Sequence, residues 1–266
     1  MRPNLVKQRM AAGHVAVNAW LSIGSSYSAE GMGHAGFHSA TVDMQHGMLA
    51  FSDALPMLQA LSSTTATPLV RVPELNPAAI MHILDAGAYG IICPMISTPE
   101  QTATLVSACR YPPTGNRSFG PSRGLLFGGA DYVAQANETV MAIPMIETQE
   151  AVDRIDEILA VEGVDMIYLG PNDMAFELDG SVGQPRTKSS KAILHILERA
   201  KAHNIPAGIF CANADEACQR ASEGFQMVTP ANDFGQLTRS AAAAVAQILN
   251  QTEGAEMPSV SNGSGY

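Results

Sequence analysis

The chain has 266 residues, of which 46% are apolar and 15% are charged, and its formal net charge is −10. The length fits one large α/β domain, and the composition argues against disorder across most of the chain. An acidic balance without a Lys/Arg cluster argues against nucleic acids and anionic membranes as partners.

The N-terminal segment and the cysteines favour a cytoplasmic protein. Residues 1–10 are too polar for a signal peptide, and no apolar run reaches the roughly 18 residues that a membrane span needs. The four cysteines form no CxxC pair. We therefore interpret them as thiols of a reduced protein, and a pair between Cys211 and Cys218, which are close in sequence, is the alternative.

Strand-like and helix-like segments alternate along the chain. Strands are expected at 14–22, 39–43, 68–72, 90–95, 140–146, 166–169, 205–210 and 225–229. Helices are expected at 5–12, 29–35, 53–61, 77–86, 99–109, 131–137, 151–160, 189–203, 215–223 and 234–249. Ser25 or Ser28 is expected to cap the second helix and Ser52 the third. The Gly- and Pro-rich segment 110–129 is expected to be a long loop, of the kind that is usually functional or mobile.

Eight such alternations in about 250 residues predict the α/β class and a single-domain (β/α)8 TIM barrel. This catalytic domain is expected to span 1–251 and to be followed by a disordered tail at 252–266. A doubly wound open sheet is the alternative. It is disfavoured because no GxGxxG follows the first strand.

Two carboxylates end neighbouring predicted strands. Glu147 follows the strand at 140–146, and Asp173 follows the strand at 166–169. Parallel strands of a βαβ unit end at the same edge of the sheet, so these side chains should lie close together. A divalent cation with oxygen ligands would relieve their repulsion. The alternative is that either residue caps the helix after it.

The second and third predicted strands carry further candidates. Asp43 and His46 are spaced so that the carboxylate can turn back to one imidazole nitrogen and make the other more basic. The alternative is a histidine that only satisfies a loop carbonyl. Arg71, in an otherwise apolar strand, would meet an anion or a developing oxyanion, or else pair with a loop carboxylate such as Glu74.

The remaining candidates concern the pocket wall. The turn Gly170-Pro171-Asn172 presents backbone N–H groups at a helix start, which suits a carboxylate ligand. Trp20 on the first strand and Phe210 on the seventh are expected to line the pocket, with Phe210 shaping one side of it. Ordinary barrel packing is the alternative for Phe210.

Several motifs in the same order resemble those of a known family. They are Ser25-Ser-Tyr-Ser-Ala-Glu30, Asp43-x-x-His46, Val70-Arg-Val-Pro73, Arg110-Tyr-Pro-Pro-x-Gly115-x-Arg117, Ile146-Glu147-Thr148, Val161-Glu-Gly-Val-Asp165 and Gly170-Pro-x-Asp173. Together they cover roughly residues 5–250. The chain resembles the class II, metal-dependent pyruvate aldolases of the 4-hydroxy-2-oxoheptanedioate and 2-keto-3-deoxy-sugar-acid type, which are related to the citrate lyase β subunit.

The resemblance implies roles for individual residues. Glu147 and Asp173 would bind Mg²⁺, Mn²⁺ or Co²⁺, and His46, oriented by Asp43, would be the base. Arg71 would hold the oxygen of the 2-oxo group, and the backbone after Gly170 would receive the substrate carboxylate. The resemblance also implies dimers that exchange their last helix and assemble into hexamers.

One position departs from the family. Gln45 stands where the family often has a glutamate, so it keeps an acceptor and loses a charge next to His46.

The expected activity is the metal-dependent, reversible cleavage of a 4-hydroxy-2-oxo acid to pyruvate or hydroxypyruvate and an aldehyde. A Schiff-base mechanism is disfavoured because Lys188, Lys191 and Lys201 fall in a loop or helix rather than at a strand end. One alternative is a CoA-ester lyase of the citramalyl or malyl type. Another is a non-catalytic barrel that binds 2-oxo acids.

Overall fold

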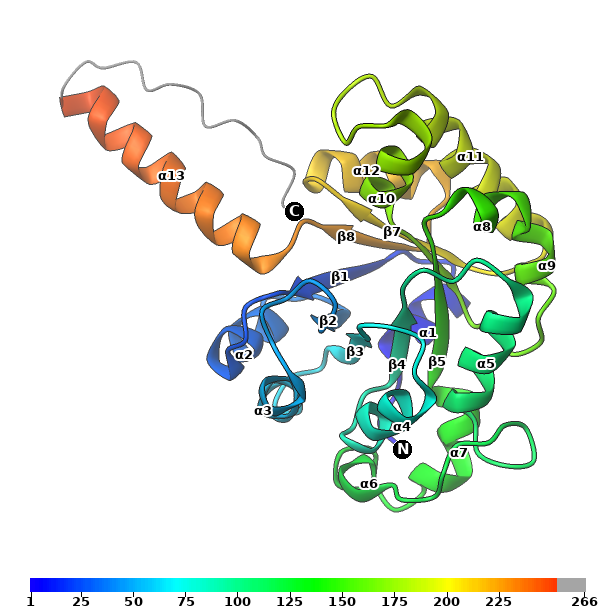
Figure 1. The fold of residues 1–266 in the computed structure, drawn as a ribbon. Coiled ribbons are helices and arrows are strands. Elements are labelled where there is room, and N and C mark those ends of the chain that lie inside the picture. The colour runs from blue at the N-terminus through cyan, green and yellow to red at the C-terminus, as the bar shows by residue number, and fades with distance from the viewer. Residues whose placement is uncertain (253–266) are drawn as a thin grey trace.

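The computed structural model describes residues 1–252 and is built around a closed barrel of parallel strands (Figure 1). The strands are β1 (Ala16–Leu21), β2 (Ser39–Asp43), β3 (Thr67–Arg71), β4 (Gly90–Cys93), β5 (Met141–Ile146), β6 (Ile167–Leu169), β7 (Ala207–Cys211) and β8 (Met227–Pro230). They pair in chain order, and β1 closes on β8 with Ala16 opposite Met227. The predicted (β/α)8 barrel is confirmed.

Helices surround the barrel. Those of the outer layer are α2 (Ser26–His34), α3 (Phe51–Leu61), α4 (Pro77–Asp85), α5 (Pro99–Cys109), α8 (Gln149–Asp153), α9 (Ile155–Leu159), α10 (Pro171–Asp179), α11 (Thr187–Ala202) and α12 (Ala214–Glu223). The others are α1 (Leu5–Ala11), α6 (Ser122–Gly128), α7 (Tyr132–Thr139) and α13 (Asp233–Thr252). Most lie within three residues of the predicted helices, because the chain's apolar periodicity and Pro or Gly boundaries are local signals.

Three local predictions were wrong. The third helix begins at Phe51 and not at 53, with Ala50 as its N-cap, because the Asp53 carboxylate accepts from the Ala50 N–H at 2.7 Å. The helix predicted at 151–160 is divided into α8 and α9 at Arg154. The predicted loop 110–129 contains α6, where Arg123 donates to the Ala86 carbonyl at 2.6 Å. Such contacts with distant segments are invisible to local composition.

Alternate strand residues face the barrel interior. The inward side chains include Leu69, Ile92, Ile143 and Tyr168, and Val6 of α1 packs with them. The outward side chains pack against the helices in a separate, larger core. Because α1 covers the interior from the amino-terminal side, only the carboxyl ends of the strands leave room for an active site, which is where barrel enzymes carry theirs.

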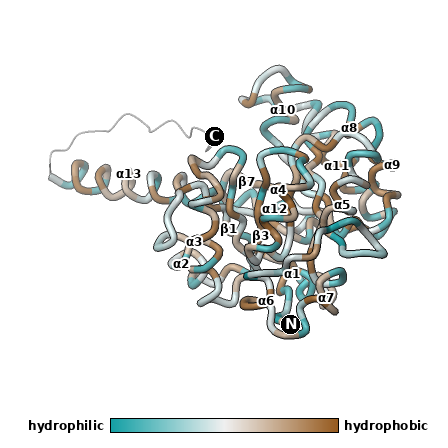
Figure 2. The backbone as a smooth tube through the Cα atoms, turned by 60° about the horizontal axis from the view of Figure 1, so that its bottom comes forward, coloured by the Kyte–Doolittle hydropathy of each residue, from teal (hydrophilic) through white to brown (hydrophobic). Residues whose placement is uncertain are grey.

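The last helix extends away from the barrel (Figure 1). Its turns alternate between apolar and polar residues along the projecting part (Figure 2). Four of its large apolar side chains are at least half exposed, namely Phe234, Leu237, Val245 and Ile248. Apart from Thr252, which ends α13, the tail predicted at 252–266 lies outside the described residues. Within residues 1–252, no helix combines the length and hydropathy required to cross a bilayer.

Candidate active site

Glu147 is the most unusual ionisable residue at the carboxyl edge. It follows β5 directly and is only 1% exposed. Its Oε1 accepts from the Met95 backbone N–H at 2.7 Å, while its buried Oε2 has no hydrogen-bond partner within the described residues. A buried carboxylate oxygen without a donor is costly, so this atom suits a cation.

Two neighbouring backbone features give Glu147 its place. Met95 has a φ of 56°, and this left-handed conformation is costly for a side chain of its kind. Met95 nevertheless supplies the N–H that fixes Oε1. A Cβ at Gly170 would lie 2.4 Å from Glu147 Oε2, so only glycine leaves room for that oxygen. Neither the role of Met95 nor this requirement for glycine was predicted from sequence.

Burial raises the pKa of Glu147 to about 7. The Met95 N–H opposes this rise, the charge of Asp173 adds to it, and the charge of Arg71 opposes it. Asp173, in the first turn of α10, is exposed, and it is near enough to act on Glu147 electrostatically. The two carboxylates therefore form the acidic pair that the strand order predicted, although their role as metal ligands stays a prediction.

The metal-free protein should lose stability as the pH rises from about 5 to 7. In that window folded Glu147 holds a proton that the unfolded chain, with an ordinary pKa of 4.5, has released. The free energy of unfolding should fall by roughly 3 kcal/mol. Urea denaturation in EDTA at several pH values, compared with Glu147→Gln, isolates this contribution. If the free energy of unfolding changed with pH equally in wild type and Glu147→Gln, this prediction would be contradicted.

Arg71 lies near enough to Glu147 to act on it electrostatically, and Asp43 holds it in place. The two residues are register partners on β3 and β2. Arg71 Nε donates to Asp43 Oδ1 and Nη2 to Oδ2, both at 2.7 Å, and Arg71 is 2% exposed. A buried two-bond ion pair of this kind fixes the guanidinium plane. The partner of Arg71 is thus Asp43 and not Glu74, the candidate from sequence.

Asp43 also organises the turn after β2. Its Oδ1 accepts from the backbone N–H groups of Gln45 at 3.2 Å and His46 at 3.4 Å. The His46 side chain is exposed beside the site, and the orientation of its imidazole by Asp43 stays a prediction. Gln45 Oε1 is buried without a hydrogen-bond partner among residues 1–252. After Glu147 Oε2, Gln45 Oε1 is therefore the second buried acceptor of the site without a partner among these residues. It belongs to the residue directly before His46.

A group of aromatic side chains packs against Arg71. Trp20 Nε1 donates to Asp43 Oδ2 at 3.0 Å, and the Arg71 guanidinium lies 4.8 Å from the centroid of the Trp20 ring. Trp20 stacks on Tyr168 at 5.4 Å and meets Phe210 edge to face at 5.6 Å between centroids. Trp20 and Phe210 are thus neighbours, and their place in a pocket wall stays a prediction. Tyr168 was missed, although alternation along β6 would have placed it inward.

The first turn of α10 completes the site. Gly170 precedes the helix, Pro171 is its first residue, and Asn172 and Asp173 follow. Pro at this position suits a helix start because it has no N–H to leave unpaired. The remaining N–H groups and the helix dipole make this end attractive to a carboxylate.

The site fits a divalent ion with few protein ligands. Within the described part of the chain no group of three or more His, Cys, Asp or Glu side chains is spaced to hold a metal. Two carboxylates with oxygen positions left for water and substrate match the way Mg²⁺ is usually bound. The unpaired, buried Glu147 Oε2 is the observation that favours such an ion.

The eight-stranded parallel barrel thus carries an acidic pair, a fixed arginine and a helix start at its carboxyl edge, the edge at which barrel enzymes place their chemistry. The model of the HpcH/HpaI aldolase/citrate lyase family matches residues 17–240, and the chain belongs to this family. It is therefore an enzyme of the aldolase type.

The chain is similar to named relatives over nearly its whole length. It is 41% identical to the hydroxypyruvate/pyruvate aldolase of Rhizorhabdus wittichii, covering 91% of this chain and 98% of that protein. It is 37% identical to the 5-keto-4-deoxy-D-glucarate aldolase of Shigella boydii, covering 88% and 91%.

Solved structures agree with the fold. An HpcH/HpaI aldolase/citrate lyase family protein from Burkholderia cenocepacia has a TM-score of 0.86 at 31% identity, covering 92% of this chain and 99% of that one. The citrate lyase β subunit of M. tuberculosis, complexed with oxaloacetate and magnesium, has a TM-score of 0.56 at 16% identity, covering 86% and 94%. At that identity the second likeness shows the fold alone.

Proposed function

We propose that this enzyme is a divalent-metal-dependent aldolase that reversibly cleaves a 4-hydroxy-2-oxo acid into pyruvate or hydroxypyruvate and an aldehyde. The observation that carries the proposal is the buried, unpaired Glu147 Oε2 beside Asp173, with a fixed Arg71 in electrostatic reach. The name of the Rhizorhabdus wittichii relative, hydroxypyruvate/pyruvate aldolase, supports a pyruvate-type donor.

Each site residue has a part in this proposal. Glu147 and Asp173 would hold Mg²⁺, Mn²⁺ or Co²⁺, which when bound supplies Lewis-acid stabilisation of the charge that develops on the 2-oxo oxygen. Arg71 would hold the same oxygen, kept in place by the Asp43 carboxylate. The start of α10, with Gly170, Pro171 and Asn172, would receive the substrate carboxylate.

Proton transfer is assigned to the turn after β2. His46, with Asp43 behind it, would take or return the proton at the substrate's C3 or at the aldehyde oxygen. Gln45 would contact water or a substrate hydroxyl through its buried Oε1. Trp20 and Phe210 would enclose the aldehyde side and keep bulk water away.

The test is proton exchange at C3 of pyruvate in deuterated water, followed by NMR with Mg²⁺, Mn²⁺, Co²⁺ or EDTA. An aldolase should exchange these protons only with a divalent ion present, and an aldehyde panel should then show condensation. A binding-only barrel would bind pyruvate without exchange. A CoA-ester lyase would instead turn over malyl- or citramalyl-CoA. Full turnover in EDTA would refute the role of the metal.

His46→Ala should slow C3 exchange by about two to three orders of magnitude, the usual contribution of a general base. Because His46 is exposed, the substitution should leave the melting temperature nearly unchanged. The measurement is the pH profile of exchange for both proteins, with the exposed His195→Ala as control. Unchanged exchange in His46→Ala would remove His46 from the mechanism.

We also propose a cytoplasmic homo-oligomer, a hexamer built as a trimer of dimers that exchange α13. The apolar side chains that α13 exposes support this proposal, because a lone projecting helix of this kind gains by covering them. Light scattering of the purified protein tests it, and a monomer at micromolar concentration would contradict it.

A further inference from the structure

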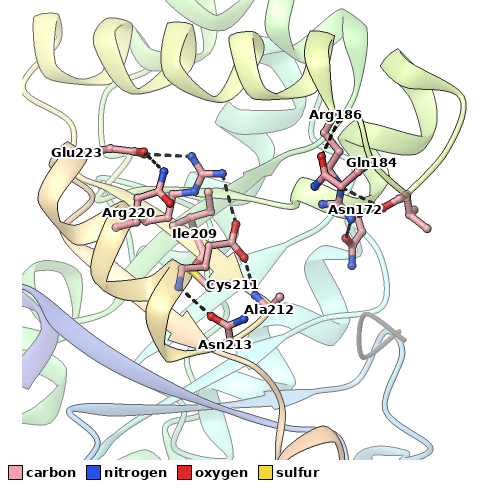
Figure 3. A network of polar contacts seen from close by, with 12 residues as sticks. Asn172, Gln184, Arg186, Ile209, Cys211, Ala212, Asn213, Arg220 and Glu223 are labelled. Atoms are coloured by element: carbon pink, nitrogen blue, oxygen red, sulfur yellow. Dashed lines mark hydrogen bonds and ion pairs between the residues drawn. The ribbon is translucent and has the colours of Figure 1, made fainter. Parts of the chain in front are cut away.

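Arg186 reaches from the loop between α10 and α11 back to the first turn of α10. Its Nη2 donates to the Asn172 Oδ1 at 2.9 Å (Figure 3). Its Nε donates to the Val182 carbonyl at 3.0 Å. Asn172 is the residue before Asp173, one of the two proposed metal ligands. A cation from a separate loop is therefore tied to the helix start that would receive a carboxylate.

The loop that carries Arg186 is anchored at both ends. Gly180 ends α10 with a φ of 74°, a conformation that glycine adopts without strain. The Asp179 carboxylate accepts from the backbone N–H groups of Lys188 at 2.8 Å and Ser189 at 3.0 Å, at the start of α11. Arg186 is thus positioned by the protein itself, before any ligand binds.

The hydrogen bond from Arg186 fixes which way the side-chain amide of Asn172 faces. Because Asn172 Oδ1 accepts from Arg186, the amide NH₂ of Asn172 must face the other way. Arg186 is half-buried. The neighbouring groups Glu147 and Asp173 are acidic, so a substrate carboxylate approaching them needs positive charge nearby.

We propose that Arg186 is a positioning residue for the carboxylate of the 2-oxo acid. It orients Asn172 and adds a positive charge at the start of α10, so that an anionic donor binds there in preference to a neutral one. This inference rests on the proposed function. It is supported by the unpaired Glu147 Oε2, which lies against Gly170 at the same helix start and marks it as a ligand site.

The experiment measures the Kd of pyruvate for the Mn²⁺-loaded protein by calorimetry, together with KM and kcat for C3 exchange. Arg186→Gln should raise Kd and KM about three- to tenfold, as expected for losing one partly exposed charged hydrogen-bonding group. Its kcat should change by less than about twofold, because Arg186 does not touch the reacting carbon. Arg186→Lys should restore part of the affinity.

Two controls separate positioning from folding. Arg199 lies on α11, pairs with Asp156 and is about as exposed as Arg186. Arg199→Gln should therefore leave the Kd of pyruvate unchanged. Asn172→Ala should weaken binding, and adding Arg186→Gln to it should weaken binding little further, because the two residues act as one unit.

The outcomes distinguish the two proposals. Suppose that wild type binds and exchanges pyruvate, while Arg186→Gln has the wild-type Kd and a lower melting temperature. Arg186 then only stabilises its loop, and this inference fails while the proposed function stands. If wild type with Mn²⁺ neither binds nor exchanges pyruvate, the proposed function fails, and this inference fails with it.

Discussion

Glu147→Gln should reduce metal-dependent turnover by about a thousandfold or more, because the variant loses the negative charge that would hold the ion. The side chain keeps its shape and can still accept from the Met95 N–H. Metal titration by calorimetry should show the loss directly, alongside C3 exchange in the presence of excess Mn²⁺.

The same variant should not be less stable than wild type at pH 7.5 without metal. It removes a buried charge whose pKa is raised to about 7, so the metal-free protein should gain stability while it loses activity. Glu150→Gln, on the exposed first turn of α8, is the matched control. It should keep the wild-type stability and the wild-type metal-dependent turnover. Wild-type metal affinity in Glu147→Gln would show that the ion binds elsewhere.

Arg71→Lys should lower turnover by about two to three orders of magnitude while keeping the positive charge. Lysine cannot make the two parallel bonds to Asp43 that hold the guanidinium, and its ammonium group lacks the planar fork. The remaining charge would therefore lie away from the position where we propose that the 2-oxo oxygen binds. The measurement is kcat/KM for C3 exchange with saturating Mn²⁺.

A matched control exists at the opposite end of the barrel. Arg110 is also buried, and it pairs with Asp165 at 2.6 Å and with the Val140 carbonyl at 3.0 Å. Arg110→Lys should destabilise the protein to a similar degree but leave kcat/KM close to the wild-type value. Near-wild-type turnover in Arg71→Lys would remove Arg71 from the mechanism.

The site was predicted in part because strand ends are local features. Glu147 and Gly170 follow apolar runs directly, and the barrel order brings such ends to one face. Asp43 and Arg71 were found as candidates, but the ion pair between them was not predicted. Their pairing depends on the register between β2 and β3, which neither strand's own sequence contains.

The sequence by itself determined the repeating order of strands and helices, the barrel, and the strand ends that carry acidic and basic residues. These follow from apolar periodicity and turn residues, which act over a few positions along the chain. Only the tertiary structure decided three hydrogen bonds of the site. Met95 donates to Glu147, Arg71 donates to Asp43, and Arg186 donates to Asn172. Each of these contacts joins separate loops or strands, and their meeting depends on barrel closure and loop conformation rather than on local preference.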